Sequence, residues 1–183
     1  MRLRHIIYTP ELFQLALERS QDEMERIMAE HEGVRGYLMA LPPCVPEPKY
    51  MDHAGFDSLV EQVGFEYDFG GCSDEHPYHR VAPAKLLSVY LWQLSSREVR
   101  DQRLLLEGMS KWAGGIIFMG IPVAYSGQPE EVDEEISEEF ARAAYELGQD
   151  HDLEADPGFY PVSRQKDSDE AGDPAAPEPV SAR

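Results

Sequence analysis

The chain has 183 residues, of which 42% are hydrophobic and 28% charged, and its formal net charge at pH 7 is −19. This length fits one domain with a hydrophobic core of its own. The excess of acid argues against direct binding to DNA or RNA and against binding to an anionic membrane surface. The chain has two cysteines, which do not make a disulfide framework, and no apolar stretch reaches the roughly 20 residues that a bilayer span needs. We therefore expect a soluble cytoplasmic protein with reduced thiols and no signal peptide.

Helical and strand patterns follow one another along the chain. Thr9 and Pro10 have the residue types of an N-cap and a first helical turn, and Gly33 is a natural stop. Four prolines in residues 42–50 exclude regular structure there. The predicted strands are 3–8, 34–41, 65–69 and, with turns, 114–126. The predicted helices are 10–32, 56–63, a helix that starts at Pro83, 95–112 and 129–148. Ser95 and Glu98 have the residue types of a capping box at the start of the fourth helix, and Trp112 is its expected last residue.

The segment 65–69 carries the clearest strand signal. Phe65, Tyr67 and Phe69 alternate with Glu66 and Asp68, which is the pattern of a strand with one buried face. Strands and helices mixed in this order predict an α+β fold with a small sheet. We expect one globular domain over residues 1–149. Residues 150–183 are rich in Pro, Ala, Asp and Ser, and predict a disordered acidic tail.

The stretch CSDEHPYHR, residues 72–80, is the first candidate site. Cys72, His76 and His79 could supply three zinc ligands, and Cys44 or His53 the fourth, although the spacing lacks the paired ligands of familiar zinc sites. The same residues could form a Cys–His nucleophile pair, or simply a polar surface loop, since the stretch is good turn material. We predict a surface loop, with no cofactor required and zinc as the alternative.

The second candidate site is the acidic segment 129–148. Residues 129–183 hold 17 acidic and 4 basic residues, so this region carries most of the net charge. In a helix, glutamates four residues apart form rows with one charge about every 6 Å, comparable to the phosphates of a nucleic-acid strand. The two predicted rows flank an apolar stripe and would contact a partner; they comprise Glu130, Glu134 and Glu138, and Glu131, Glu135 and Glu139. The alternative is a solvated face that only keeps the protein soluble.

Two further groups predict structure rather than chemistry. Arg97, Arg100 and Arg103 lie near one helix face, where nearby acids, namely Glu98, Asp101 and Glu107, predict a salt-bridged surface. Trp92 and Trp112 lie in apolar runs and are expected in the core.

The function that these patterns favour is binding to another macromolecule. We expect a small acidic cytoplasmic protein that modulates or inhibits a basic protein or complex, such as a nucleic-acid-binding enzyme, by a surface that mimics nucleic acid. Small inhibitors of phages and mobile elements are analogous in type only. The alternatives are an enzyme or zinc-binding protein with its site at Cys72, His76 and His79, and a structural or assembly factor.

Overall fold

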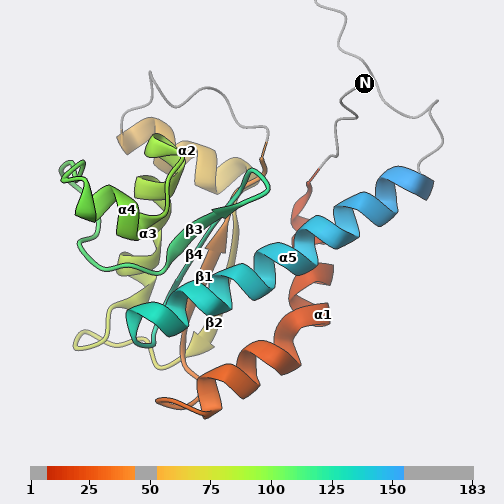
Figure 1. The fold of residues 1–183 in the computed structure, drawn as a ribbon, viewed down its shortest axis with the longest axis horizontal. Helices are drawn as coiled ribbons and strands as arrows, with labels where there is room; N and C mark the ends of the chain where they lie inside the picture. Colours follow the sequence, from red (N-terminus) through yellow and green to blue (C-terminus); the bar gives the residue numbers. More distant parts are fainter. Residues whose placement is uncertain (1–7, 44–52, 155–183) are drawn as a thin grey trace, which may run out of the picture.

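Five helices and a four-stranded antiparallel sheet make up the described part of the chain (Figure 1). The structure is a computed structural model, and it describes residues 8–43 and 53–154. The predicted α+β class is therefore confirmed. The helices are α1 (Pro10–Ala29), α2 (His53–Val63), α3 (Tyr78–Trp92), α4 (Ser96–Asp101) and α5 (Glu130–Glu154). The strands are β1 (Gly36–Ala40), β2 (Phe65–Gly70), β3 (Gly115–Phe118) and β4 (Ile121–Ser126).

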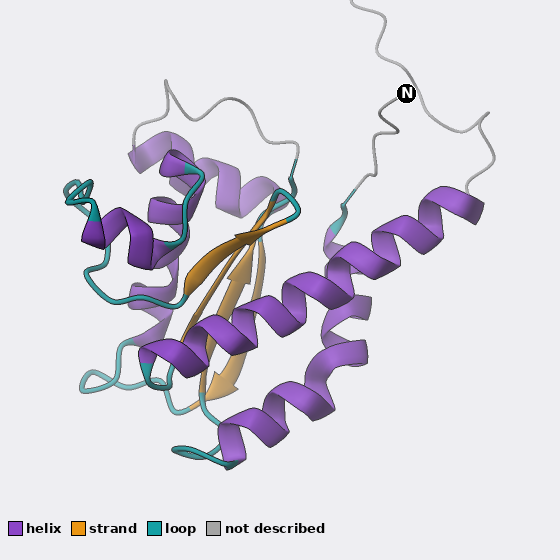
Figure 2. Cartoon of the chain, in the orientation of Figure 1, coloured by secondary structure: helices purple, strands orange, loops and turns teal. Residues whose placement is uncertain are grey.

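The sheet has the strand order β2-β1-β4-β3, and helices cover both of its faces (Figure 2). Helices α1 and α5 pack against each other and on one face, while α2 and α3 cover the other face. Because side chains alternate along a strand, Leu38 and Tyr125 enter the core under α1 and α5, whereas Met39 and Ala124 enter the core under α2 and α3. No helix among the described residues is both long and apolar enough to cross a membrane.

Helix α1 begins as its sequence predicts. The hydroxyl of Thr9 accepts a hydrogen bond from the Leu12 N–H at 3.3 Å, which satisfies one of the backbone donors left free at a helix start. Pro10 occupies the first turn, where its missing N–H costs nothing. The helix ends at Ala29, and Gly33 follows with φ +88°, a backbone conformation that favours glycine.

Strand β2 confirms the predicted alternation. Phe65 is buried in the α1/α5 core, where its ring stacks on Phe140 with the centroids 5.5 Å apart. Tyr67 and Phe69 pack against the same core. Glu66 accepts a hydrogen bond at 2.7 Å from the hydroxyl of Tyr37, a side chain that packs against the core under α2 and α3.

Two predicted helix boundaries are wrong, and so is the predicted burial of the two tryptophans. Helix α3 begins at Tyr78 and contains Pro83 in its interior, at the cost of one backbone hydrogen bond. The capping box at Ser95 forms, but α4 ends at Asp101, after which Arg103 takes φ +59° and breaks the helix. Trp112 consequently lies outside any helix and is 52% exposed. Trp92, the last residue of α3, is 36% exposed, so neither tryptophan lies in the core.

The C-terminal helix is longer than its sequence predicts. Helix α5 continues to Glu154, beyond the expected end at Gly148, so the segment expected as a tail from residue 150 starts inside this helix. The rest of that tail, residues 155–183, lies outside the described residues. The predicted strand at 3–8 and the proline-rich segment 42–50 also lie mostly outside them.

Candidate functional site

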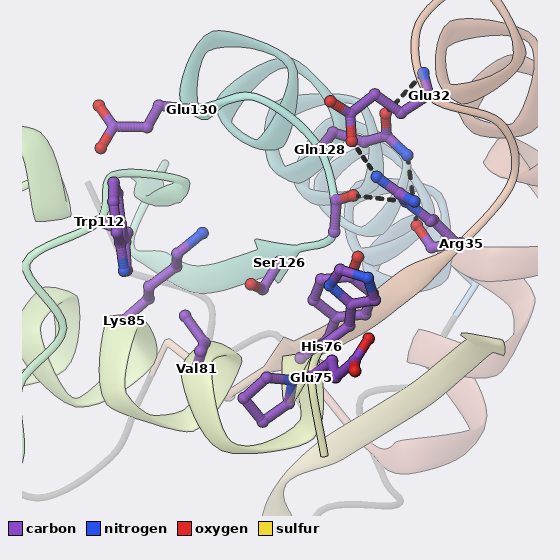
Figure 3. A pocket seen from close by; sticks show the side chains of 13 residues that line it. Glu32, Arg35, Glu75, His76, Val81, Lys85, Trp112, Ser126, Gln128 and Glu130 are labelled. Carbon is purple, nitrogen blue, oxygen red and sulfur yellow. Dashed lines mark hydrogen bonds and ion pairs between the residues drawn. The ribbon is translucent and has the colours of Figure 1, made fainter. Parts of the chain in front are cut away.

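A pocket of about 370 Å³ opens at one end of the sheet (Figure 3). Four segments that are far apart in the sequence line it. They are the α1–β1 connection, the loop that leads into α3 with the start of that helix, the segment before β3, and the β4–α5 turn. The pocket therefore exists only because the sheet order brings these four segments together.

Lys85, which lines this pocket, belongs to a buried ion pair. The ammonium of Lys85, on α3, is 2.6 Å from Oδ2 of Asp133, on α5, and it also donates to the Tyr125 carbonyl at 3.0 Å. Lys85 is only 1% exposed and Asp133 only 2%. The pair thus links the helix on one face of the sheet, through the end of β4, to the helix on the other face.

Asp133 also shapes the β4–α5 turn. Its second oxygen, Oδ1, accepts the Gln128 N–H at 2.8 Å. The Gln128 side chain in turn donates to the Gly33 carbonyl at 2.8 Å, which joins this turn to the α1–β1 connection. The carboxylate therefore helps to position two of the four segments that line the pocket.

Burial acts in opposite directions on the two charges, since it penalises the ionised form of each. It raises the pKa of Asp133 to about 6, although the neighbouring Lys85 pulls that pKa down. Burial likewise lowers the pKa of Lys85, and Asp133 opposes that shift. The two groups therefore depend on each other to remain ionised at neutral pH.

The segment before β3 closes over the ion pair. Gly114 has φ +121°, and its carbonyl accepts a hydrogen bond from the hydroxyl of Ser137 at 2.8 Å. A Cβ atom at Gly114 would lie 2.7 Å from the Lys85 ammonium and 2.5 Å from Cβ of Asp133. A side chain here would therefore collide with the pair that the glycine covers.

The Cys–His stretch contributes one edge of the pocket. His76 lines it, and its ring stacks on Tyr78 with the centroids 5.7 Å apart. Cys72 donates to Asp68 at 3.7 Å, and burial raises the pKa of its thiol, which disfavours the nucleophilic thiolate. His79 is exposed on the first turn of α3.

A zinc site at this stretch stays a prediction. Among the described residues, no three His, Cys, Asp or Glu side chains converge as metal ligands do. Cys44, the proposed fourth ligand, lies outside the described residues, so the full set of ligands is not within the described part of the chain.

The predicted glutamate rows on α5 contact arginines of the same chain. Arg100 binds both carboxylate oxygens of Glu130, at 2.9 and 2.8 Å. Arg97 donates to Glu134 at 2.9 and 3.1 Å and reaches Glu131 at 3.3 Å. These two arginines belong to α4, so the first turns of α5 hold that short helix against the domain.

Only part of the predicted arginine pairing is found. Arg100 does contact Asp101, at 3.1 Å, as expected, but the principal partners of the α4 arginines lie on α5. Arg142 binds Glu138 at 2.9 Å and Glu139 at 3.1 Å within α5 itself. Of the six predicted contact glutamates, Glu135 alone has no ion pair to a described residue.

Replacing both Arg97 and Arg100 with glutamine should lower the free energy of unfolding by more than the loss of a pair within one helix, because two half-buried ion pairs between α4 and α5 are lost. In each pair, one guanidinium nitrogen contacts both carboxylate oxygens. Urea denaturation measures this loss. Arg142→Gln is the matched control, since its pairs lie within one helix and should be worth only about 0.5 kcal/mol. Equal losses in the two proteins would mean that the α4–α5 contact adds nothing beyond surface charge.

The two helical layers differ sharply in charge. The sequences of α1 and α5 contain sixteen acidic residues and three arginines, a net charge of −13. Helices α2, α3 and α4 together contain four acidic and four basic residues. Most of the net charge of the chain thus lies in the layer on one face of the sheet.

Sequence reasoning missed the ion pair and the pocket. A signal for each partner is present, however: Lys85 is a lone basic residue within an apolar run, and Asp133 falls on the apolar side of α5, four residues before Ser137, which is also buried. Neither signal identifies its partner. Trp112 was expected in the core, and its place in the pocket lining follows from the early end of α4.

No protein-family model matches the chain, and no curated protein and no solved structure is significantly similar to it.

Proposed function

We propose that this protein acts in the cytoplasm by binding a basic protein or complex, such as a nucleic-acid-binding enzyme, and modulating or inhibiting it. The observation that supports this proposal is the segregation of charge: the α1/α5 layer has a net charge of −13, and the α2–α4 helices are neutral. A one-sided field of this kind steers and orients an oppositely charged partner before contact.

The rigidity of the acidic layer also supports the proposal. Arg19 on α1 binds Glu146 on α5 at 3.0 Å and lies 3.9 Å from Asp150, so the two helices are joined by charge as well as by their core. A rigid array loses little conformational entropy when it binds. The two members of the proposed contact set with most freedom are Glu131, whose side chain is 76% exposed, and Glu135, which has no ion pair among the described residues.

The test begins with isolation of the partner by pull-down from the native host. Association rate constants are then measured over a salt series for the wild type and for a variant with Glu131, Glu135 and Glu138 changed to glutamine. We expect the variant to associate about tenfold more slowly at low salt, because rim charges act mainly on association. The difference should vanish near 1 M salt, where the Debye length is about 3 Å.

A matched control removes the same charge from the other side of the domain. It carries Asp57→Asn, Glu61→Gln and Glu107→Gln, three exposed positions outside α1 and α5. This protein should associate at close to the wild-type rate. Equal slowing of both variants would show that the net charge, and not the position of the charges on α5, determines the association rate. No slowing of either variant would overturn the proposal.

A further inference from the structure

The pocket at the end of the sheet is lined by a hydroxyl that makes no hydrogen bond to a described residue. Ser126, the last residue of β4, is 5% exposed and lines the pocket, yet its side chain makes no hydrogen bond to a described residue. Figure 3 shows its hydroxyl directed into the space between Lys85 and His76. No fully buried side-chain nitrogen or oxygen among the described residues lacks a hydrogen-bond partner, so this unpaired hydroxyl is one that the pocket leaves accessible to a ligand.

Other groups around the pocket can also donate hydrogen bonds that no described residue receives. Tyr78 lines the pocket, and its hydroxyl also has no hydrogen bond to a described residue. The Lys85 ammonium has three N–H donors, and two of them are used, by Asp133 and by the Tyr125 carbonyl. The guanidinium of Arg35 contacts the Gly127 carbonyl and Glu32 through Nε and one Nη, which leaves its other Nη.

The acceptors that line the pocket are mostly occupied. Glu32 is bound by Arg35, and Glu130 is bound by Arg100 and by the Ala113 N–H. Glu75, which is exposed at the rim, is the one lining carboxylate without an ion pair to a described residue. The two free hydroxyls can either donate or accept, but the Lys85 ammonium and the Arg35 guanidinium only donate. An incoming group that accepts hydrogen bonds therefore finds more free partners than an incoming donor, for which Glu75 is the one free carboxylate among the described lining residues.

The remaining lining is apolar or aromatic. Val81, Pro77 and the half-exposed indole of Trp112 lie around the pocket together with the stacked rings of His76 and Tyr78. A volume of about 370 Å³ is at the small end of ligand pockets, which typically hold about 300–1,000 Å³. These walls suit a compact body with an apolar or aromatic surface.

We propose that this pocket binds a small carboxylate with an aromatic or apolar body. The carboxylate oxygens accept hydrogen bonds from the hydroxyls of Ser126 and Tyr78 beside the Lys85 ammonium, and the body lies against Trp112. The net charge of −19 opposes the approach of any anion, but at physiological ionic strength that field decays over about 8 Å. None of the groups assigned to the carboxylate or to its body lies on α1 or α5, so this proposal and the proposed function can fail separately.

The first test uses three probes that share one body and differ in the charge of the polar group: phenylacetate, phenylacetamide and 2-phenylethylamine. Each is titrated into the full chain, and the indole N–H resonance of Trp112 is followed by NMR. We expect phenylacetate to bind most tightly. Tightest binding by the amine, or no shift with any of the three probes, would overturn the proposal.

Two conservative variants then test the assigned donors. Ser126→Ala and Tyr78→Phe each remove a hydroxyl that no described residue uses, so both proteins should keep the wild-type melting temperature. Each should weaken phenylacetate binding about three- to tenfold, the equivalent of one hydrogen bond. Ser58→Ala on α2, at a residue that does not line the pocket, is the matched control and should leave the affinity unchanged. Unchanged affinity in both pocket variants would also overturn the assignment.

A further comparison separates the two sources of such a carboxylate. The tripeptide Gly-Gly-Phe is titrated beside phenylacetate, with the C-terminal amide of the same peptide as its control. Tighter binding of the free-acid peptide assigns the pocket to a peptide C-terminus, and tighter binding of phenylacetate assigns it to a free small acid. Binding of the amide as tightly as the free acid contradicts a carboxylate site.

Discussion

Lys85→Met should lower the free energy of unfolding by about 3–5 kcal/mol, because it leaves the buried carboxylate of Asp133 without its counter-ion. The methionine fills nearly the same volume, so the loss is electrostatic rather than a packing defect. Chemical denaturation at pH 8 measures it. Lys111→Met is the control, since it makes the same change at an exposed lysine whose Nζ lies 4.8 Å from the centroid of the Trp112 ring. It should lower the free energy of unfolding by less than about 1 kcal/mol.

The loss caused by Lys85→Met should shrink in acid. Without Lys85, the pKa of Asp133 rises further above its wild-type value of about 6. A carboxyl group whose pKa is higher in the folded than in the unfolded state reduces stability above the folded pKa, and protonation relieves that cost as the pH falls. Denaturation at pH 5 should therefore show a smaller difference from wild type than at pH 8.

A second substitution separates the unpaired charge from other effects. In Lys85→Met combined with Asp133→Asn, no buried charge remains, and the asparagine oxygen can still accept the Gln128 N–H. This double variant should recover most of the lost stability, as buried ion pairs often do when both charges are replaced. A pH-independent loss that the second substitution does not repair would show that the ammonium matters for its contact with the Tyr125 carbonyl instead.

Gly114→Ala should lower the free energy of unfolding by about 3 kcal/mol. This loss is the sum of an unfavourable positive φ and a collision in a packed interior. The added methyl group would meet the Asp133 side chain, the Lys85 ammonium and the Tyr125 carbonyl, all within 2.9 Å. The Tyr125 carbonyl belongs to β4, so it cannot move away without disturbing that strand. Thermal or urea denaturation of the purified variant measures the effect.

Gly33→Ala provides the matched control for Gly114→Ala. Gly33 also has a positive φ, +88°, but a Cβ atom there would meet nothing within 4 Å. Gly33→Ala should lower the free energy of unfolding by about 1 kcal/mol, because the only penalty there is the unfavourable positive φ. The difference between the two variants then reports the collision at the ion pair. Equal losses would show that the segment before β3 shifts freely and does not hold the pair in place.

Together, these results would assign Lys85, Asp133 and Gly114 a positioning role. They hold the β4–α5 turn and the segment before β3, which are two of the four segments that line the pocket. A binding surface built on such fixed elements needs little rearrangement to accept a ligand.

Local patterns in the sequence were sufficient to predict most of the secondary structure and the fold class. The alternation of Phe65, Tyr67 and Phe69 placed one face of β2 in the core, and the apolar stripe through Ile136 and Phe140 did the same for α5. The caps at Thr9 and Ser95 also formed where they were predicted. Signals of this kind are reliable because burial periodicity and capping depend on residues only two to four positions apart.

The partners of the charged side chains were decided by the tertiary structure. Arg97 was expected to pair within its own helix, but it meets Glu134, which is 37 residues away. Lys85 and Asp133 are separated by 48 residues and belong to layers on opposite faces of the sheet. The composition determined that the protein is acidic, but the packing of α1 on α5 determined that the acid gathers in one layer. Charges act through space, so their partners depend on the order of the strands and on which face each helix covers, and neither is encoded in local spacing.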